Sequence, residues 1–274
     1  MESALGAVAP GLTSDQPHAP SGNHWAPQSP HTERSIDDMN ARVPPADAAL
    51  DFVESLSPRA SAAFLGVSAA RTDTSDLDIV IVGSEGPYRE SFVHNGWPVE
   101  AFVHTPESWR AFFASDVARR RPSLPYMCGR GIVLIDVDGL GSRIAAEARA
   151  LLDAGPPPLT PGELAQRRYR VTDSIDDLIG SRSLPESLFI GAALVHEVTS
   201  LSLGASGRWE GEGKWSLRLL KEKDPESARA VVAGLRRLAT GEDPAPLIAW
   251  AESELRAAGG RLFEGYRASG YPLT

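Results

Sequence analysis

Phe64 to Val82 reads FLGVSAARTDTSDLDIVIV, and this stretch decides the fold. It contains a short apolar strand, a turn of small and polar residues, and a second strand. The run Ile79–Val82 in the second strand is continuously apolar and β-branched, which is typical of a strand buried on both faces of a sheet. Asp76 and Asp78 stand at the start of this strand. Residues i and i+2 of a strand point to the same face, so both carboxylates are expected side by side, with Leu77 turned into the core.

Two neighbouring carboxylates repel each other unless a cation lies between them. Mg²⁺ is the natural candidate, because proteins hold this hard ion through one or two carboxylates together with the phosphates of a substrate. A solvated strand end that carries two aspartates is the alternative. An Asp-x-Asp pair alone does not decide between these two interpretations.

A third carboxylate follows in the next predicted hairpin. Residues 88–103 contain two strand-like runs joined by Asn95-Gly96, a strong signal for a tight turn. Glu100 is the single acid in the returning run, and if this strand pairs beside the two aspartates, three carboxylates converge. Such a site could hold two metal ions for an in-line phosphoryl displacement. Alternatively, Glu100 could accept the proton of an attacking hydroxyl group.

These features resemble the nucleotidyltransferase core of the DNA polymerase β type, and within that superfamily the chain is most similar to the bacterial aminoglycoside and related small-molecule nucleotidyltransferases. The resemblance implies transfer of a nucleoside monophosphate from ATP, or another nucleoside triphosphate, to a hydroxyl group of a small, aminoglycoside-like acceptor, with release of pyrophosphate. Antibiotic resistance is the role that such an acceptor would imply. The motifs that carry the resemblance are Gly66-x-Ser68, Asp76-Leu77-Asp78 and the strand Val99-Glu100-Ala101-Phe102, within roughly residues 60–136.

The resemblance also implies a role for each motif residue, with Mg²⁺ as cofactor and the nucleoside triphosphate as co-substrate. Asp76 and Asp78 match the metal-binding pair. Glu100 matches the third carboxylate, as a metal ligand or as the general base. Gly66 and Ser68 match the turn that cradles the triphosphate, where backbone N–H groups and a hydroxyl suit phosphate binding.

Two cations are further candidates for contacts with the triphosphate. Arg71 lies in the same turn, and a solvated turn arginine is the alternative. Lys214 follows Gly213 at a predicted helix start, where the helix N-terminus would add to its positive charge. A solvated loop lysine is the alternative for this residue.

Two other classes of function stay open. The family usually has glycine directly before the serine, where this chain has Val67, and a β-branched side chain limits how closely the backbone can approach a phosphate. A nucleotide-binding or toxin–antitoxin partner protein without catalysis is therefore one alternative. A nucleotidyltransferase that acts on a protein or an RNA is the other. The net charge of −9 and the isoelectric point of about 5.2 argue against nucleic acid, whose binding proteins are normally basic.

Composition narrows the class of protein to which the chain can belong. The 274 residues include 42% hydrophobic residues, which is enough for buried cores. The single cysteine, Cys128, excludes an intrachain disulfide framework and a cysteine metal cluster. No stretch reaches the run of about 18 apolar residues that a membrane span needs, and the N-terminus lacks a signal-peptide pattern. We therefore expect a cytoplasmic protein without a membrane partner, and the family resemblance is compatible with a homodimer.

The chain is predicted to be an α+β protein of two domains. Residues 1–43 are rich in proline, serine, glycine and histidine and are expected to be a disordered tail. Residues 44–154 would form the mixed-sheet nucleotidyltransferase domain. Residues 155–159, with three prolines, would form a stiff linker. Residues 160–274 would form a helical bundle, with helices at about 161–181, 185–204, 214–221, 225–239 and 243–258. The resemblance implies that this bundle completes the cleft.

Several charged or aromatic residues have two interpretations. Arg119–Arg121 would be either a helix end stabilised by the helix dipole or a phosphate contact. Asp136 and Asp138 form a second Asp-x-Asp, which a turn explains better than a metal site. Glu197 could serve as a base or hold a substrate ammonium group, or lie on the helix surface. Trp215 is expected in the core.

Overall fold

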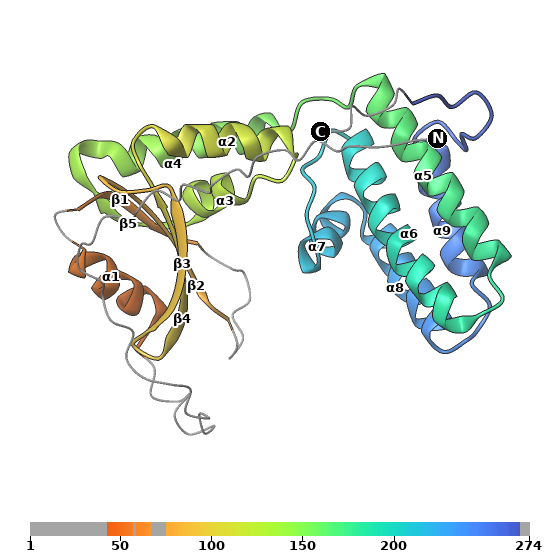
Figure 1. Ribbon diagram of the computed structural model, residues 1–274, viewed down its shortest axis with the longest axis horizontal. Helices are drawn as coiled ribbons and strands as arrows, with labels where there is room; N and C mark the ends of the chain where they lie inside the picture. Colours follow the sequence, from red (N-terminus) through yellow and green to blue (C-terminus); the bar gives the residue numbers. More distant parts are fainter. Residues whose placement is uncertain (1–42, 57–58, 67–74, 269–274) are drawn as a thin grey trace, which may run out of the picture. The chain divides into compact units, whose positions relative to one another are not determined.

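The predicted tail, residues 1–43, lies outside the described residues except for Val43. The computed structural model describes residues 43–56, 59–66 and 75–268 (Figure 1).

A five-stranded mixed sheet forms the first part of the described chain, with the strand order β3-β4-β2-β1-β5. β2 and β4 are parallel, and every other neighbouring pair in this sheet is antiparallel. β2 is the central strand, and its apolar run is buried on both faces, as its composition predicts. The strands are β1 (Ala60–Leu65), β2 (Leu77–Gly83), β3 (Tyr88–His94), β4 (Trp97–His104) and β5 (Ile132–Asp136).

The hairpin between β3 and β4 closes at the predicted two-residue turn. Asn95 and Gly96 have φ angles of 46° and 79°. Both residues therefore adopt the left-handed conformation that the tight hairpin turn requires, which asparagine and glycine accept most readily. This turn fixes the register that places Glu100 within β4.

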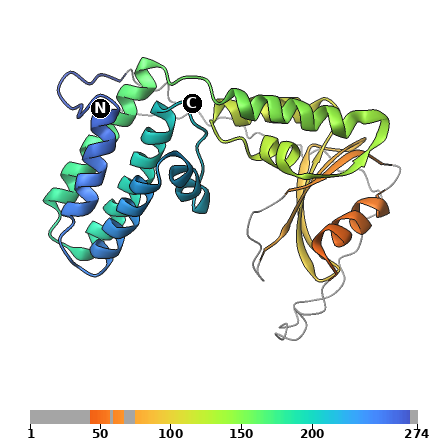
Figure 2. The same cartoon turned by 180° about the vertical axis from the view of Figure 1, so that it is seen from behind.

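Helices cover both faces of the sheet (Figures 1 and 2). α1 (Pro45–Ser55) packs on one face, where its buried Ala48, Ala49 and Val53 join a core with Leu77 and Val99. The other face carries a second core, built from buried residues of β1 and β2 with those of α2 (Ser108–Ala118), α3 (Ser123–Arg130) and α4 (Leu140–Ala154).

α3 is a helix that the sequence pattern does not predict. Its segment contains Pro125 and Gly129, two residues that disfavour helix interiors, and it is only eight residues long. Leu124 and Cys128 are buried against the sheet. Tertiary burial therefore stabilises a helix that local propensity does not indicate.

The chain after the proline-rich segment is helical in its described part, and each helix begins and ends within a few residues of its predicted limits. Thr160 and Glu163 form a complete capping box at the first of these helices. The predicted fold class, a mixed-sheet domain followed by a helical bundle, is thus confirmed, while the boundary at residues 155–159 stays a prediction. The helices are α5 (Pro161–Gly180), α6 (Leu184–Ala205), α7 (Lys214–Lys223), α8 (Pro225–Ala239) and α9 (Ala245–Ala257).

α6 differs from the expectation that no stretch has the length and apolarity of a membrane span. By length and composition alone it is long and apolar enough to cross a membrane. Its Leu194, Val198 and Leu201 are fully buried in the core of the bundle. The core helix of a soluble protein meets the same criteria of length and hydropathy, and 44% of the apolar window of α6 is buried.

Candidate metal centre and its cavity

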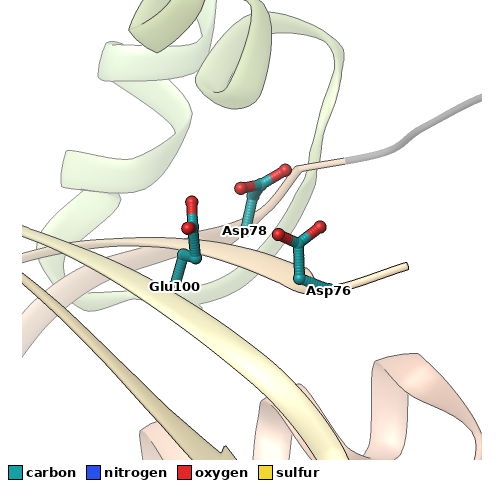
Figure 3. Close-up of side chains that lie close together, drawn as sticks. All are labelled: Asp76, Asp78 and Glu100. Atoms are coloured by element: carbon teal, nitrogen blue, oxygen red, sulfur yellow. The ribbon is translucent and has the colours of Figure 1, made fainter. Parts of the chain in front are cut away.

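The structure brings together the three acids that the sequence singled out. Asp78 on β2 stands opposite Glu100 on β4 in the parallel register, and Asp76 lies just before β2. One carboxylate oxygen from each of the three residues lies within 4.8 Å of the other two. The three side chains rise from the same side of the sheet, as Figure 3 shows. The roles that the resemblance assigns to them stay predictions.

Strand alternation explains why these carboxylates leave the core. Leu77 is fully buried in the core under α1, so Asp76 and Asp78 project to the opposite face of β2. On β4, Val99 and Ala101 are buried in that same core, which leaves Glu100 on the face of the aspartates. Asp78 and Glu100 are half-buried, and Asp76 is exposed.

The electrostatic surroundings of Asp78 favour an additional cation. Burial of the carboxyl group is the largest cause, followed by the negative charges of Asp76 and Glu100, and together they raise the pKa of Asp78 to about 6. The positive charges of Arg89 and Lys214 act in the opposite direction. A bound divalent cation would lower the repulsion among the three carboxylates.

Arg89 is a neighbour of the three acids that was not among the residues predicted for the site. Its guanidinium lies 2.5 Å from a carboxylate oxygen of Glu100 and 5.1 Å from the centroid of the Phe102 ring. The register of the β3–β4 hairpin places Arg89 directly opposite Phe102, two residues along from Glu100. The hairpin signal in the sequence could have indicated this proximity, because cross-strand neighbours follow from the turn.

The three acids line a cavity of about 1120 Å³. Small-molecule sites usually have volumes of about 300–1,000 Å³, so this cavity could hold more than one small substrate. Lys214, the first residue of α7, lines it as well. Gly66 also lines the cavity, and its backbone N–H donates to the carbonyl of Asp78 at 2.8 Å. Ser68 and Arg71, the other predicted triphosphate contacts, lie outside the described residues.

Two aromatic rings form a further part of the cavity wall, which we call the aromatic shelf: Tyr126 and Trp215. Their rings are nearly parallel, at 18°, with centroids 6.2 Å apart. Arg130 lies over the Tyr126 ring and Arg218 over the Trp215 ring. The prediction that Trp215 lies in the core is wrong, because the first turn of α7 borders the cavity and leaves this side chain 39% exposed.

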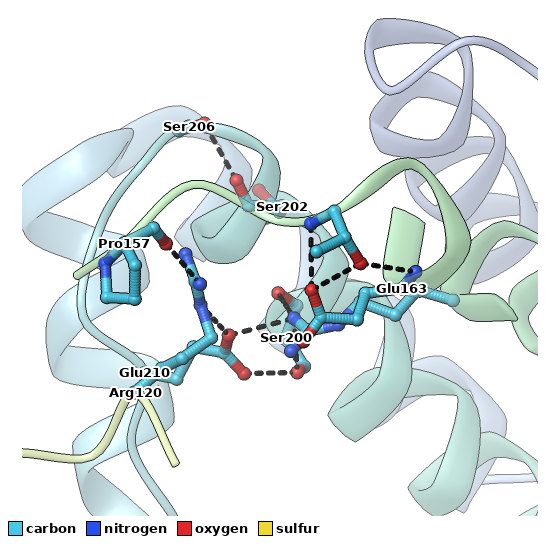
Figure 4. A network of polar contacts seen from close by, with 9 residues as sticks. Arg120, Pro157, Glu163, Ser200, Ser202, Ser206 and Glu210 are labelled. Carbon is cyan, nitrogen blue, oxygen red and sulfur yellow. Dashed lines mark hydrogen bonds and ion pairs between the residues drawn. The ribbon is translucent and has the colours of Figure 1, made fainter. Parts of the chain in front are cut away.

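Arg120 is neither a simple helix end nor a phosphate contact. Its side chain is buried, with Nε 3.0 Å from a carboxylate oxygen of Glu210. Arg167 lies 2.8 Å from the same oxygen, and Ser200 donates a hydrogen bond of 2.5 Å to the other oxygen of Glu210. Arg120 also donates to the carbonyl of Pro157 (Figure 4). This buried network joins the end of α2 to α5, α6 and the segment before α7.

The two neighbours of Arg120 also have carboxylate partners. Arg119 pairs with Asp116, and Arg121 pairs with Glu212. Both arginines line the cavity of the three acids. Their ion pairs account for their positions without a bound phosphate.

The structure keeps Glu197 and Asp136 apart from the candidate centre. Glu197 accepts a hydrogen bond of 2.6 Å from Ser174 and lines a different cavity, of about 410 Å³. Asp136 accepts from the backbone N–H of Gly141 at 2.7 Å and from the hydroxyl of Ser142 at 2.5 Å. These contacts hold the start of α4, so Asp136 has the turn role that was predicted for the second Asp-x-Asp.

No protein-family model and no curated protein matches the chain. Among solved structures, the chain is similar to a nucleotidyltransferase-like protein from Exiguobacterium sibiricum 255-15, with 11% sequence identity over 77% of this chain and 74% of that chain and a TM-score of 0.42. A likeness of this extent identifies neither a reaction nor a substrate for this chain.

Proposed function

We propose that the chain is a Mg²⁺-dependent nucleotidyltransferase, which transfers a nucleoside monophosphate from ATP or another nucleoside triphosphate to a hydroxyl group of a small acceptor. The observation that carries this proposal is the convergence of the Asp76, Asp78 and Glu100 carboxylates within 4.8 Å, in the wall of a cavity that Lys214 also lines. Aminoglycosides are the first class of acceptor to test, because the sequence resemblance implies them.

The residues present fit a hard divalent cation. All three candidate ligands are carboxylates, the donor type that Mg²⁺ prefers, and burial together with the charges of Asp76 and Glu100 raises the pKa of Asp78. The bound ion would neutralise charge on the phosphates during an in-line displacement. Asp76 and Asp78 would hold it, and Glu100 would be either its third ligand or a base.

The proposed reaction forms a bond between the acceptor oxygen and the α-phosphorus and breaks the bond from the α-phosphorus to the oxygen that bridges to the β-phosphate. Pyrophosphate leaves with that oxygen, and the proton of the acceptor hydroxyl passes to Glu100 or to solvent. Lys214 would contact the triphosphate as a point charge. The aromatic shelf, Tyr126 and Trp215, offers a flat apolar surface for a nucleobase or for a sugar ring. Catalysis by these groups would consist mainly of positioning and charge neutralisation.

Pyrophosphate release is the experiment that tests this function. Wild type, the double variant Asp76→Asn, Asp78→Asn and the control Asp138→Asn would each be assayed with Mg²⁺, with each of the four common nucleoside triphosphates, and across a panel of aminoglycosides and other polyols. We expect acceptor-dependent release by wild type and by the control. The double variant should be slower by roughly hundredfold or more, since the charge neutralisation is lost.

The control separates a metal effect from a general effect of removing aspartates. Asp138 also belongs to an Asp-x-Asp, and its left-handed backbone, with a φ of 52°, accepts asparagine readily. Binding of metal–ATP with no release on any acceptor would favour the non-catalytic nucleotide-binding alternative. Release that requires a protein or RNA acceptor would overturn the small-molecule assignment.

A further inference from the structure

Arg89 is a cation that already pairs with the candidate metal centre. Its guanidinium is 2.5 Å from Glu100, and it lies over the ring of Phe102, with all three residues in the wall of the same cavity. The side chain of Arg89 is 58% exposed, whereas that of Glu100 is 25% exposed. The arginine is therefore held on one side by the carboxylate and the ring and is open to the cavity on another.

The ion pair of Arg89 with Glu100 opposes the binding of a metal ion at the same carboxylates. A guanidinium has no acceptor atom and stays protonated in proteins, so Arg89 cannot relieve its repulsion from a nearby cation by losing a proton. It also engages an oxygen of Glu100 that would otherwise be available to the ion. In the absence of nucleotide, Arg89 and a metal ion therefore compete for the same negative charge.

A nucleoside triphosphate changes this balance. It brings several negative charges into the cavity, and phosphate oxygens match the planar, two-pronged donor set of a guanidinium. Arg89 has a long and largely exposed side chain next to the three acids, so it can exchange Glu100 for a phosphate oxygen without a rearrangement of β3. Lys214, the other cation that acts on Asp78, lies on α7, and within the part of the chain that the structure describes it forms no ion pair with the three acids.

We propose that Arg89 couples metal binding to nucleotide binding: it holds Glu100 in the metal-free protein and pairs with a phosphate of the nucleotide when the metal binds at the acids. The coupling rests on the proposed function, because it requires both ligands in this cavity. Through this coupling the metal binds weakly alone and strongly together with the nucleotide. Each ligand therefore increases the affinity of the site for the other.

The test compares Mn²⁺ binding, as a spectroscopic substitute for Mg²⁺, in wild type, Arg89→Gln and the control Arg59→Gln. Arg59 is a matched exposed arginine, 4.0 Å from its partner Glu85. Each protein is titrated with Mn²⁺ by electron paramagnetic resonance, first alone and then with α,β-methylene-ATP, which cannot be cleaved at the α-phosphorus. Circular dichroism confirms that each variant is folded.

Two shifts of opposite sign are expected for Arg89→Gln. Mn²⁺ alone should bind about tenfold more tightly, which is the effect of removing a unit charge about 6 Å from a divalent ion in a water-like dielectric. Mn²⁺ with the nucleotide analogue should bind roughly tenfold more weakly, since the phosphate contact is lost. Arg89→Lys keeps the charge but not the planar guanidinium. Its affinity for Mn²⁺ alone should stay near that of wild type, and its affinity for Mn²⁺ with the nucleotide analogue should be weaker.

Other outcomes overturn the proposal. Unchanged affinities in both titrations would reduce the ion pair to a surface contact. Weaker binding of Mn²⁺ alone would show instead that Arg89 orients Glu100 for the metal. If wild type binds no Mn²⁺ in either titration, both this inference and the metal-dependent function fail, whereas normal binding by wild type with no change in Arg89→Gln overturns the inference alone.

Discussion

Asp78 stands directly opposite Glu100 across the parallel pair of β2 and β4, and Asp76 adds a third carboxylate within 4.8 Å. Like charges opposite each other in a sheet destabilise the folded state. The backbone nevertheless fixes this arrangement, because Leu77 and Val99, the neighbours of the two acids in the register, are buried in the core under α1. Repulsion among the three carboxylates therefore lowers the stability of the metal-free protein at the proposed metal site.

Replacing Asp78 with asparagine should therefore stabilise the free protein. The pKa of Asp78 is raised from 3.8 to about 6, so the folded state favours the protonated carboxyl, and the stability that this protonation gives is lost as the pH rises toward and through about 6. Asparagine resembles the protonated form at every pH. We expect Asp78→Asn to be more stable than wild type by about 1–3 kcal/mol near pH 8, with a smaller difference near pH 5.

Urea denaturation at the two pH values measures this difference. A variant less stable than wild type near pH 8 would contradict the electrostatic interpretation. An equal difference at both pH values would show that the gain comes from packing rather than from the carboxylate charge.

Metal binding should depend on pH through the same group. A ligand carboxylate must lose its proton to bind the ion, so protons compete with the metal below the pKa of Asp78. The affinity for Mn²⁺ should be constant above about pH 7 and fall by roughly tenfold per pH unit below about pH 6. Titrations across this range, with circular dichroism to confirm folding, check the result. A flat profile down to about pH 4 would exclude Asp78 as a ligand.

The buried ion pair of Arg120 and Glu210 should contribute more to the stability of the folded protein than an exposed ion pair does. Removing one member of a buried ion pair leaves the other charged and unpaired, which costs about 3–5 kcal/mol. Arg120→Ala keeps Arg167 and Ser200 as partners of Glu210, so we expect it to lose less than this, about 1.5–3 kcal/mol, in chemical denaturation. Arg229→Ala, which removes an exposed pair with Glu226, should lose less than about 1 kcal/mol. Similar losses for the two variants would mean that the Arg120 network contributes no more than a surface contact.

The aromatic shelf should contribute to ligand affinity. Stacking on one ring is worth about 0.5–1.5 kcal/mol, so Trp215→Ala should weaken either metal–ATP or acceptor binding by roughly threefold to tenfold. Calorimetry with each ligand shows which of the two the shelf contacts. Phe189→Ala is the matched control, because Phe189 is 83% exposed and does not line this cavity. Unchanged affinities for both ligands would remove the shelf from the site.

The second Asp-x-Asp should have a purely structural role. Asp136 accepts two hydrogen bonds at the start of α4, so Asp136→Ala should be less stable than wild type. The same variant should bind Mn²⁺ as wild type does. Loss of Mn²⁺ binding in a folded Asp136→Ala protein would move the metal site to this turn.

The sequence predicted those features that depend on local periodicity. An apolar run of β-branched residues indicates a central strand, and the alternation of Leu77 with its two flanking aspartates indicates which side chains leave the core. The Asn95-Gly96 turn fixes the hairpin and therefore the position of Glu100. Proline and capping residues likewise gave the limits of the helices after residue 160.

Features that depend on distant contacts could not be predicted. The pairing of Arg120 with Glu210 joins residues far apart in the sequence, and no periodicity connects them. Trp215 follows a helix start, where sequence alone does not distinguish a cavity wall from the core. α3 forms because the sheet buries one of its faces, against its own weak propensity. The predicted roles of Ser68 and Arg71 stay predictions, since both lie outside the described residues.

The proposed function requires Asp76 and Asp78 to bind a divalent metal together with a nucleoside triphosphate. The decisive test is calorimetric titration of Mg²⁺–ATP into wild type, into the double variant Asp76→Asn, Asp78→Asn, and into Asp138→Asn. We expect binding by wild type and by Asp138→Asn, and none by a folded double variant. Equal binding by the double variant and wild type, or no binding by wild type, would contradict the claim.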